Sequence, residues 1–529
     1  MNQPRARETD GARGEYPSTR ATAIGALFVL GLALLLYGGP VPRLSEELYL
    51  ALARHTGDAT FLAGDWTLSG PYGEHWVFDH LFGPMAAAVP LTWFGWAGRL
   101  ITWGLLATLL IRLGGRIGLR PGGAAAAIGL WLVANQALIG SDWMFGTFEA
   151  KTVAYCLLVG ALLAATRRRV PLAIGLLGLT IAMHPGIGIW AALGGGAALL
   201  ADPDTRRDAL RWSWLGILLA VPGAIGVLDT VRGTTGALQQ FVVLDAIPHH
   251  LDPFFGGARL EWLQVIGRAL ALVGMLAANV VWFRRAPRDQ AARFLMVFQL
   301  VVFAPVVIAF LARGFETWPF LLLQPLRLGP LIIPLLFFFH LVGRVGHLRR
   351  TEPRPRSFLR RPSMQLAFVG ILLAVFVTSP VLAAPRMVAR TLQAWVDPDD
   401  EVAAFDWIRE HTPSTTRCVV PVDRQDVFMR AERPTVAIWQ AIRYDSLGQW
   451  KHRITALVGG PREFTRAVKS GDELTGLRAA YDQMSTVDIT AVARKYRANC
   501  IVATTQYPLP VWHRSGTVRI YRIGREPAP

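Results

Sequence analysis

Eleven apolar runs follow one another between residues 21 and 384, and they constrain the fold of this chain more than any other feature of its sequence. A bilayer core about 30 Å thick requires roughly 20 apolar residues per helix, and shorter runs are tolerated inside helix bundles. Only 17% of the residues are charged, whereas soluble domains carry about 25%. The sequence therefore predicts an α-helical membrane bundle with about eleven spans. The runs lie at approximately 21–38, 90–111, 122–140, 150–166, 171–184, 186–201, 213–228, 262–283, 294–312, 320–340 and 366–384.

Basic residues are divided unevenly between the two sets of loops. Twenty-four arginines lie in segments that share a side with the N-terminus, against six basic residues in the alternate loops. Because loops rich in Arg and Lys stay cytoplasmic, we expect the tail 1–20 inside the cell and everything after residue 384 outside it. The first run lacks a convincing cleavage site, so we expect an uncleaved anchor in the inner (plasma) membrane. The net charge of +17 then reflects membrane orientation, and we expect membrane lipids and no nucleic acid as partners.

The run 171–201 needs a break, because basic clusters that should both be cytoplasmic flank it. Proline and glycine interrupt helical hydrogen bonding. We therefore expect two short helices that meet near His184-Pro185-Gly186, at the outer side of the membrane.

Composition changes after about residue 385, and the segment 385–529 is expected to be an extracytoplasmic α/β domain. WVDPDDEVAAFDWIREHTP carries a capping Asp and helical apolar spacing, and the β-rich RCVVPV follows it. VDITAVARKYRA predicts a second helix before the strand NCIVATT, and TVRIYRI alternates like an edge strand. Cys418 and Cys500 each open a predicted strand, so they are either a disulfide or adjacent free thiols.

Acidic residues are frequent in the outer loops, and the group that most suggests a functional site lies in the loop 39–81. Ser45 precedes Glu46 and Glu47 at a predicted helix start. These acids either complement the helix dipole or, with Asp65, serve as a general base or hold a divalent cation. His75 and Asp79 have the i, i+4 spacing of a metal pair, although loop residues of these types are commonly only solvated.

Charged and polar residues also lie at the ends of predicted spans. Arg327, with Gln324 beside it, falls within the outer end of the span 320–340. It either snorkels to the interface, pairs with an acid such as Glu316, or binds a phosphate. Glu149 and Lys151 at the start of another span pair with each other or with substrate, and His184 is either structural or part of a binding site.

The arrangement resembles the integral-membrane glycosyltransferases of the C fold superfamily, which includes protein mannosyltransferases and bacterial lipid A aminoarabinose transferases. Members carry an acidic pair after the first span, and Glu46-Glu47-Leu48-Tyr49 looks like that pattern, with Glu in place of the usual first Asp. The resemblance implies a polyprenyl-phosphate sugar donor and an acid of this loop as base or metal ligand. The tail, with DWIREHTP, VVPV and ERPTV, also looks like bacterial multispanning proteins of unassigned function.

The resulting hypothesis is a membrane glycosyltransferase that moves a sugar from a polyprenyl phosphate to an extracytoplasmic acceptor. Its catalytic candidates are Glu46, Glu47 and Asp65, and its substrate-binding candidates are Arg327, Gln324, Glu149, Lys151 and His184. Two alternatives stay open: a transporter or flippase that uses the breaks near His184 and Pro325, and a non-catalytic assembly protein of the cell envelope.

Overall fold

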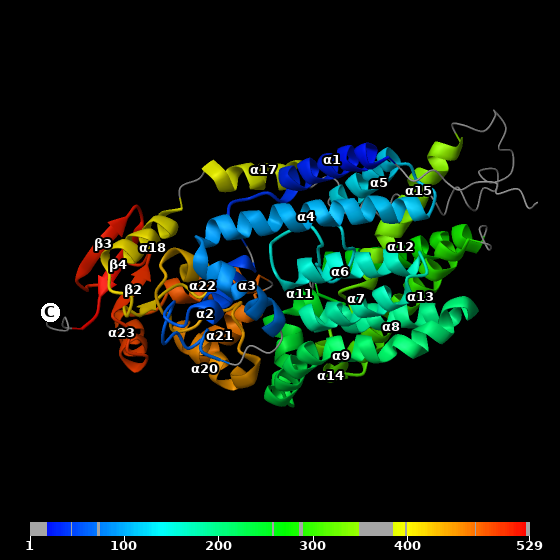
Figure 1. Ribbon diagram of the computed structural model, residues 1–529. Coiled ribbons are helices and arrows are strands. Elements are labelled where there is room, and N and C mark those ends of the chain that lie inside the picture. Colours follow the sequence, from blue (N-terminus) through cyan, green and yellow to red (C-terminus); the bar gives the residue numbers. More distant parts are fainter. Residues whose placement is uncertain are drawn as a thin grey trace, which may run out of the picture.

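The computed structural model is mostly helical, and a small four-stranded sheet lies near the C-terminus (Figure 1). It describes residues 18–43, 45–70, 75–255, 259–284, 289–348, 384–396, 399–470 and 472–524. Apolar helices lie alongside one another in one part of the molecule, and the sheet with its helices forms the other part, beyond α2 and α3 (Figure 1).

Four helices are long and apolar enough to cross a membrane: α1 (Thr19–Tyr37), α4 (Leu91–Arg116), α12 (Arg259–Arg284) and α13 (Gln290–Gly314). Five shorter apolar helices accompany them. The predicted number of eleven spans is therefore not confirmed, and most of the run 366–384 lies outside the described residues. The shorter helices are α5 (Pro121–Val133), α6 (Ala150–Ala165), α7 (Val170–Met183), α8 (Pro185–Ala201) and α15 (Gly329–Leu348), and the run 213–228 lies within α9 (Pro203–Gly233).

Two of the predicted spans are interrupted. The expected break near His184 is confirmed, because α7 ends at Met183 and α8 begins at Pro185. The break near Pro325, within the predicted span 320–340, is present as well. A turn at 323–328 separates α14 (Trp318–Leu322) from α15, since Gln324 has a φ of 58° and Pro325 follows it.

Short helices in the connecting segments lie between the apolar helices and the C-terminal part. Helices α2 (Glu46–Gly57) and α3 (Trp76–Ala88) come from the predicted outer loop 39–81, and they pack against each other. A third segment contributes α10 (Ala237–Phe241), the π-helix η1 (Val242–Ala246) and α11 (Pro248–Leu251).

The C-terminal part combines helices with the sheet, as expected for an α/β domain. The predicted helix after Asp399 is α18, and the Asp399 carboxylate accepts hydrogen bonds from the N–H groups of Glu401 and Val402. Its elements are α17 (Ala384–Val396), α18 (Asp400–His411), β1 (Cys418–Val419), α19 (Val427–Arg430), η3 (Tyr444–Ser446), α20 (Leu447–Leu457), α21 (Pro461–Val468), α22 (Glu473–Asp482), α23 (Thr486–Lys495), β2 (Cys500–Ala503), β3 (Val511–Ser515) and β4 (Val518–Arg522).

The strand order β1-β2-β4-β3 corrects one prediction. TVRIYRI forms β4, which was expected to be an edge strand and is instead interior, since it pairs antiparallel with both β2 and β3. Strand β3, which the sequence analysis did not identify, occupies that edge. Buried Val518, Ile520 and Tyr521 fit the interior position of β4.

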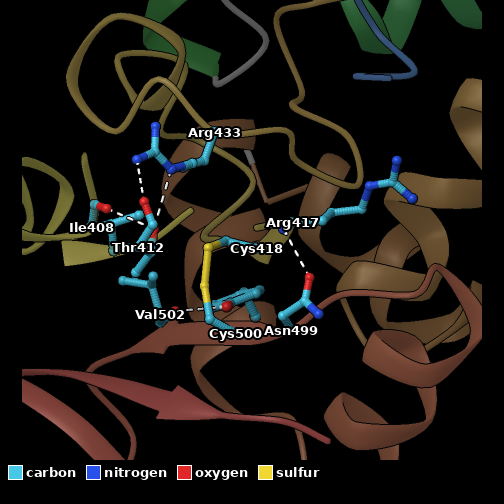
Figure 2. Close-up of a disulfide and its surroundings, with 9 residues drawn as sticks. Ile408, Thr412, Arg417, Cys418, Arg433, Asn499, Cys500 and Val502 are labelled. Carbon is cyan, nitrogen blue, oxygen red and sulfur yellow. Dashed lines mark hydrogen bonds between the residues drawn. A yellow bond between two sulfur atoms is a disulfide. The ribbon is translucent and has the colours of Figure 1, made fainter. Parts of the chain in front are cut away.

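A disulfide joins Cys418 of β1 to Cys500 of β2, the first of the two alternatives left open by the sequence (Figure 2). The two residues are register partners in the parallel strand pair, with their Cα atoms 4.7 Å apart. Beside them, Arg417 N–H donates to the Asn499 side chain, and Arg433 donates to Thr412 (Figure 2).

Candidate functional site

Polar and aromatic side chains from both parts of the chain surround a cavity of about 230 Å³. Segments that the sequence analysis assigned to the outer side of the membrane supply one wall, and the C-terminal domain supplies the other. Five of the predicted substrate-binding residues line it together: Glu149, Lys151, His184, Gln324 and Arg327. The other lining residues used below are Tyr49, His75, Trp143, His249, His250, Arg443, Asp445 and Glu473.

Asp142 holds two cations side by side at this cavity. Its Oδ1 lies 3.4 Å from Lys151 Nζ and 3.5 Å from Arg327 Nη1. Its Oδ2 accepts a 2.6 Å hydrogen bond from the Tyr155 hydroxyl, and the Trp143 N–H donates to Oδ1 at 2.9 Å. Charge-assisted hydrogen bonds are typically about 2.7–2.9 Å long. Both cation contacts are longer than this, so Asp142 places Lys151 and Arg327 next to each other at the cavity.

Lys151 has two further neighbours. Its Nζ lies 3.3 Å from Glu149 Oε1, which confirms that these two predicted residues pair with each other, and 3.3 Å from the centre of the Trp143 ring. Glu149 Oε1 also accepts a hydrogen bond from the Thr147 hydroxyl at 2.7 Å. Gly146 makes room for the Trp143 ring, because a Cβ there would lie 2.0 Å from a ring carbon.

The two helix breaks meet at the cavity. Gly186 at the start of α8 lies against Gln324, whose Oε1 would be 2.3 Å from a Cβ at that glycine. The Trp190 indole donates to the carbonyl of Leu323 at 2.9 Å, and Arg327 N–H donates to the carbonyl of Gln324 at 3.1 Å. The turn 323–328 is thereby fixed against α8, and Arg327, only 7% exposed, reaches Asp142.

Four histidines contribute to the lining. The His75 ring lies 5.3 Å from that of His184 and 4.6 Å from that of Tyr49, between ring centres. Burial lowers the pKa of His249 to about 4, with smaller contributions from the charges of Arg327 and Lys151. The same causes, burial first, lower the pKa of His250, which contacts the carbonyl of Gly140 at 3.1 Å. These two rings are neutral at pH 7.

The cavity does not include the acidic residues that were expected to be catalytic. Glu46 is fully buried and forms an ion pair with Arg99 of α4, whose Nε donates to Glu46 Oε1 at 2.6 Å. The N–H of Phe148 donates to the same oxygen at 2.7 Å, and that of Arg43 to Oε2 at 3.2 Å. Glu46 therefore ties the start of α2 to α4 and to the segment before α6.

Glu47 and Asp65 also lie away from the cavity lining. Burial and the neighbouring Asp426 raise the pKa of the Glu47 carboxyl. Asp65 accepts hydrogen bonds from the N–H groups of Thr67, Leu68 and Thr435, at 2.8, 3.1 and 2.7 Å. Asp65 thus connects the loop 39–81 to the C-terminal domain, and burial raises the pKa of its carboxyl. The catalytic roles of Glu46, Glu47 and Asp65 stay predictions.

A bound divalent cation, one of the roles expected for the acidic residues of the loop 39–81, would need a cluster of ligand side chains. In the part of the chain that the structure describes, no three His, Cys, Asp or Glu residues lie together as a metal site would require. His75 lines the cavity, whereas Asp79 is buried in α3.

The sequence analysis missed several residues of this site. Asp142 was not singled out, although its place in the short segment that also carries Glu149 and Lys151 was an available signal. His249 and His250 were not among the site residues expected from the sequence. Nothing in the sequence pattern points to Arg443, which donates to the carbonyl of Trp66 at 2.6 Å and pairs with Asp445.

Comparisons with known proteins give one family match and several similar folds. A family model described as a domain of unknown function (DUF6798) matches residues 399–457, the stretch that contains DWIREHTP, VVPV and ERPTV. No curated protein matches the chain.

Among solved structures, the oligosaccharyltransferase AglB of Archaeoglobus fulgidus, in complex with an inhibitory peptide and a dolichol-phosphate, is 13% identical with a TM-score of 0.47. This match covers 92% of the present chain and 69% of AglB. ArnT of Cupriavidus metallidurans, bound to undecaprenyl phosphate, is 16% identical with a TM-score of 0.48, over 95% of this chain and 98% of ArnT. Both matches cover most of this chain at low identity.

Proposed function

We propose that the cavity is the active site of a membrane glycosyltransferase whose donor is a sugar linked to a polyprenyl phosphate. The observation that carries the proposal is the pair of buried cations, Lys151 and Arg327, held next to each other by Asp142. A guanidinium offers a planar set of donors that matches phosphate, and an ammonium adds a compact positive charge. The pair suits a phosphate that carries a lipid and a sugar.

The proposed sugar transfer develops negative charge on the phosphate of the donor. When the bond between the anomeric carbon and the phosphate oxygen breaks, its electron pair stays on the phosphate. Lys151 and Arg327 would stabilise that negative charge. The acceptor hydroxyl attacks the anomeric carbon from the opposite face, and one such displacement inverts the configuration. A general base must take the hydroxyl proton, and we assign that role to a carboxylate of the cavity.

Glu149 is the carboxylate best placed for that proton transfer. It lines the cavity, and its Oε1 lies 3.3 Å from Lys151, one of the two cations that would hold the phosphate. Asp445 and Glu473 also line the cavity. The two oxygens of Asp445 are engaged by Arg443, and Glu473 is a further competing base for the same assay. Glu46, Glu47 and Asp65 remain the competing bases from the sequence analysis, and each can be tested in the same assay.

The test uses the full chain in detergent with a panel of undecaprenyl-phosphate sugars, a membrane extract as acceptor, and mass spectrometry of the undecaprenyl phosphate released. Glu149→Gln is expected to lower the release rate roughly a hundredfold or more while undecaprenyl phosphate still binds. Arg327→Lys and Lys151→Gln are expected to weaken that binding about tenfold or more. The matched control is Asp208→Asn, an exposed carboxylate on α9, which should change neither quantity.

Two results would contradict the proposal. Full activity of Glu149→Gln, with a hundredfold loss in Glu47→Gln, would move the base to the predicted acidic pair. Tight binding of undecaprenyl phosphate without release from any donor would favour the transporter alternative, for which both helix breaks at the cavity would form the binding site.

A further inference from the structure

A second cavity, of about 410 Å³, lies where the apolar helices meet the C-terminal domain. It shares no lining residue with the first cavity. One side consists of Pro42 and residues 87–92, which form the connection from α3 into α4. The other sides carry three arginines from separate elements: Arg54 of α2, Arg409 of α18 and Arg430 of α19.

These arginines have little compensating negative charge inside the cavity. Glu432 is the only acid in the lining, and its Oε1 lies 3.5 Å from Arg54 Nη1. Arg409 contacts Asp406 and Glu410, both outside the lining, at 3.4 and 3.5 Å.

Arg430 is the least satisfied of the three. Within the described ranges it forms no ion pair with a carboxylate, although its charge lowers the pKa of the Glu47 carboxyl slightly. The Nε atoms of both Arg430 and Arg54 are buried without a hydrogen-bond partner among the described residues. A buried N–H without a partner is costly, so these donors indicate a missing acceptor.

The position of the cavity indicates where that acceptor comes from. The candidate membrane span α4 begins at Leu91, within the lining itself. Next to it Trp93 is 72% exposed, and Leu81, Met85 and Val89 expose their apolar side chains on α3 and just after it. Exposed tryptophans beside apolar side chains are typical of the membrane–water interface. The three arginines therefore lie at the level of lipid headgroups.

We infer that this cavity binds the phosphate of an anionic membrane phospholipid. Arginine donors arranged around one cavity match the several acceptor oxygens of a phosphate. Because Arg409 and Arg430 belong to the C-terminal domain and residues 87–92 to the membrane helices, a lipid bound here would fasten the two parts of the molecule together at the membrane surface.

The test measures lipid binding by the full chain in detergent, by native mass spectrometry, with phosphatidylglycerol, phosphatidylcholine and inorganic phosphate as separate probes. Arg430→Gln and Arg54→Gln are each expected to weaken phosphatidylglycerol binding about tenfold, since each removes a charge-assisted hydrogen bond to phosphate. Arg514→Gln on β3, an exposed arginine far along the chain from the lining, is the matched control and should bind as the unmodified protein does. Size-exclusion profiles and melting temperatures establish that each variant is folded.

Unchanged phosphatidylglycerol binding in both folded variants would overturn the inference. Binding of inorganic phosphate that is equally strong and equally sensitive to Arg430→Gln would overturn the lipid source and leave a site for free phosphate. Equal binding of phosphatidylcholine and phosphatidylglycerol would also contradict it, because three arginines should prefer a net negative headgroup.

Discussion

Breaking the ion pair between Glu46 and Arg99 should destabilise the protein severely. Both side chains are fully buried, and Glu46 accepts two hydrogen bonds from Arg99 and one each from the N–H groups of Phe148 and Arg43. Arg99 Nη1 also donates to the carbonyl of Gly39 at 2.6 Å. Removing one partner of a buried pair leaves an uncompensated charge and costs about 3–5 kcal/mol. We expect a loss of that size for Glu46→Gln and also for Arg99→Met.

A double-mutant cycle isolates the interaction. Once Arg99 is absent, Glu46→Gln no longer strands a charge, so the double variant should be about as unstable as one single variant. The coupling free energy is then roughly 3 kcal/mol. Equilibrium unfolding in mixed micelles with increasing SDS measures the free energy of each variant. The matched control is Glu47→Gln in the same helical turn, which should cost at most about 1 kcal/mol.

The same variants decide whether Glu46 has a chemical role. If the two single losses of stability simply add, the two residues do not interact as the structure indicates and the reasoning is refuted. If Glu46→Gln keeps its stability but loses turnover a hundredfold, the carboxylate acts in catalysis, as the resemblance to the transferase superfamily implies.

Three further outcomes follow from the structure. Replacing Cys418 and Cys500 together by alanine removes a covalent link between residues 82 apart in sequence. The free energy of unfolding of the C-terminal domain should fall by about 4 kcal/mol. A denaturant titration monitored by circular dichroism checks this. His249 has a folded-state pKa of about 4, below its ordinary 6.5, so the stability it contributes is complete above pH 6.5 and is lost as the pH falls toward 4. That loss is roughly 3 kcal/mol. The melting temperature of His249→Asn should therefore depend less on pH in this range than that of the unmodified protein. An unchanged pH dependence would contradict the burial argument. Gly146→Ala would push the Trp143 ring out of place and should weaken undecaprenyl phosphate binding at least severalfold, with a normal affinity excluding a role for that ring.

Parts of the fold could be predicted because local patterns decide them. Long apolar runs indicate helices, Pro185 ends one, and Asp399 caps another, so the break at His184 and the start of α18 followed directly from the sequence. The interior place of β4 could not, because nothing local distinguishes it from an edge strand without knowledge of β3.

The site was partly predictable for a related reason. An arginine or lysine at the end of an apolar span is costly unless it has a partner, which singled out Arg327 and Lys151. The partner was not predictable, since Asp142 lies 185 residues from Arg327 along the chain. The same argument applied to Arg99, inside the predicted span 90–111, would have raised the expectation of a buried acid, and Glu46 is that acid.

The most direct measurement of the central claim is an experimental structure of the full chain with undecaprenyl phosphate bound. The account predicts that the phosphate lies within hydrogen-bond distance of both Lys151 Nζ and the Arg327 guanidinium, with Glu149 facing the space where the sugar would be. A phosphate bound elsewhere, with Lys151 and Arg327 still directed at Asp142, would contradict it.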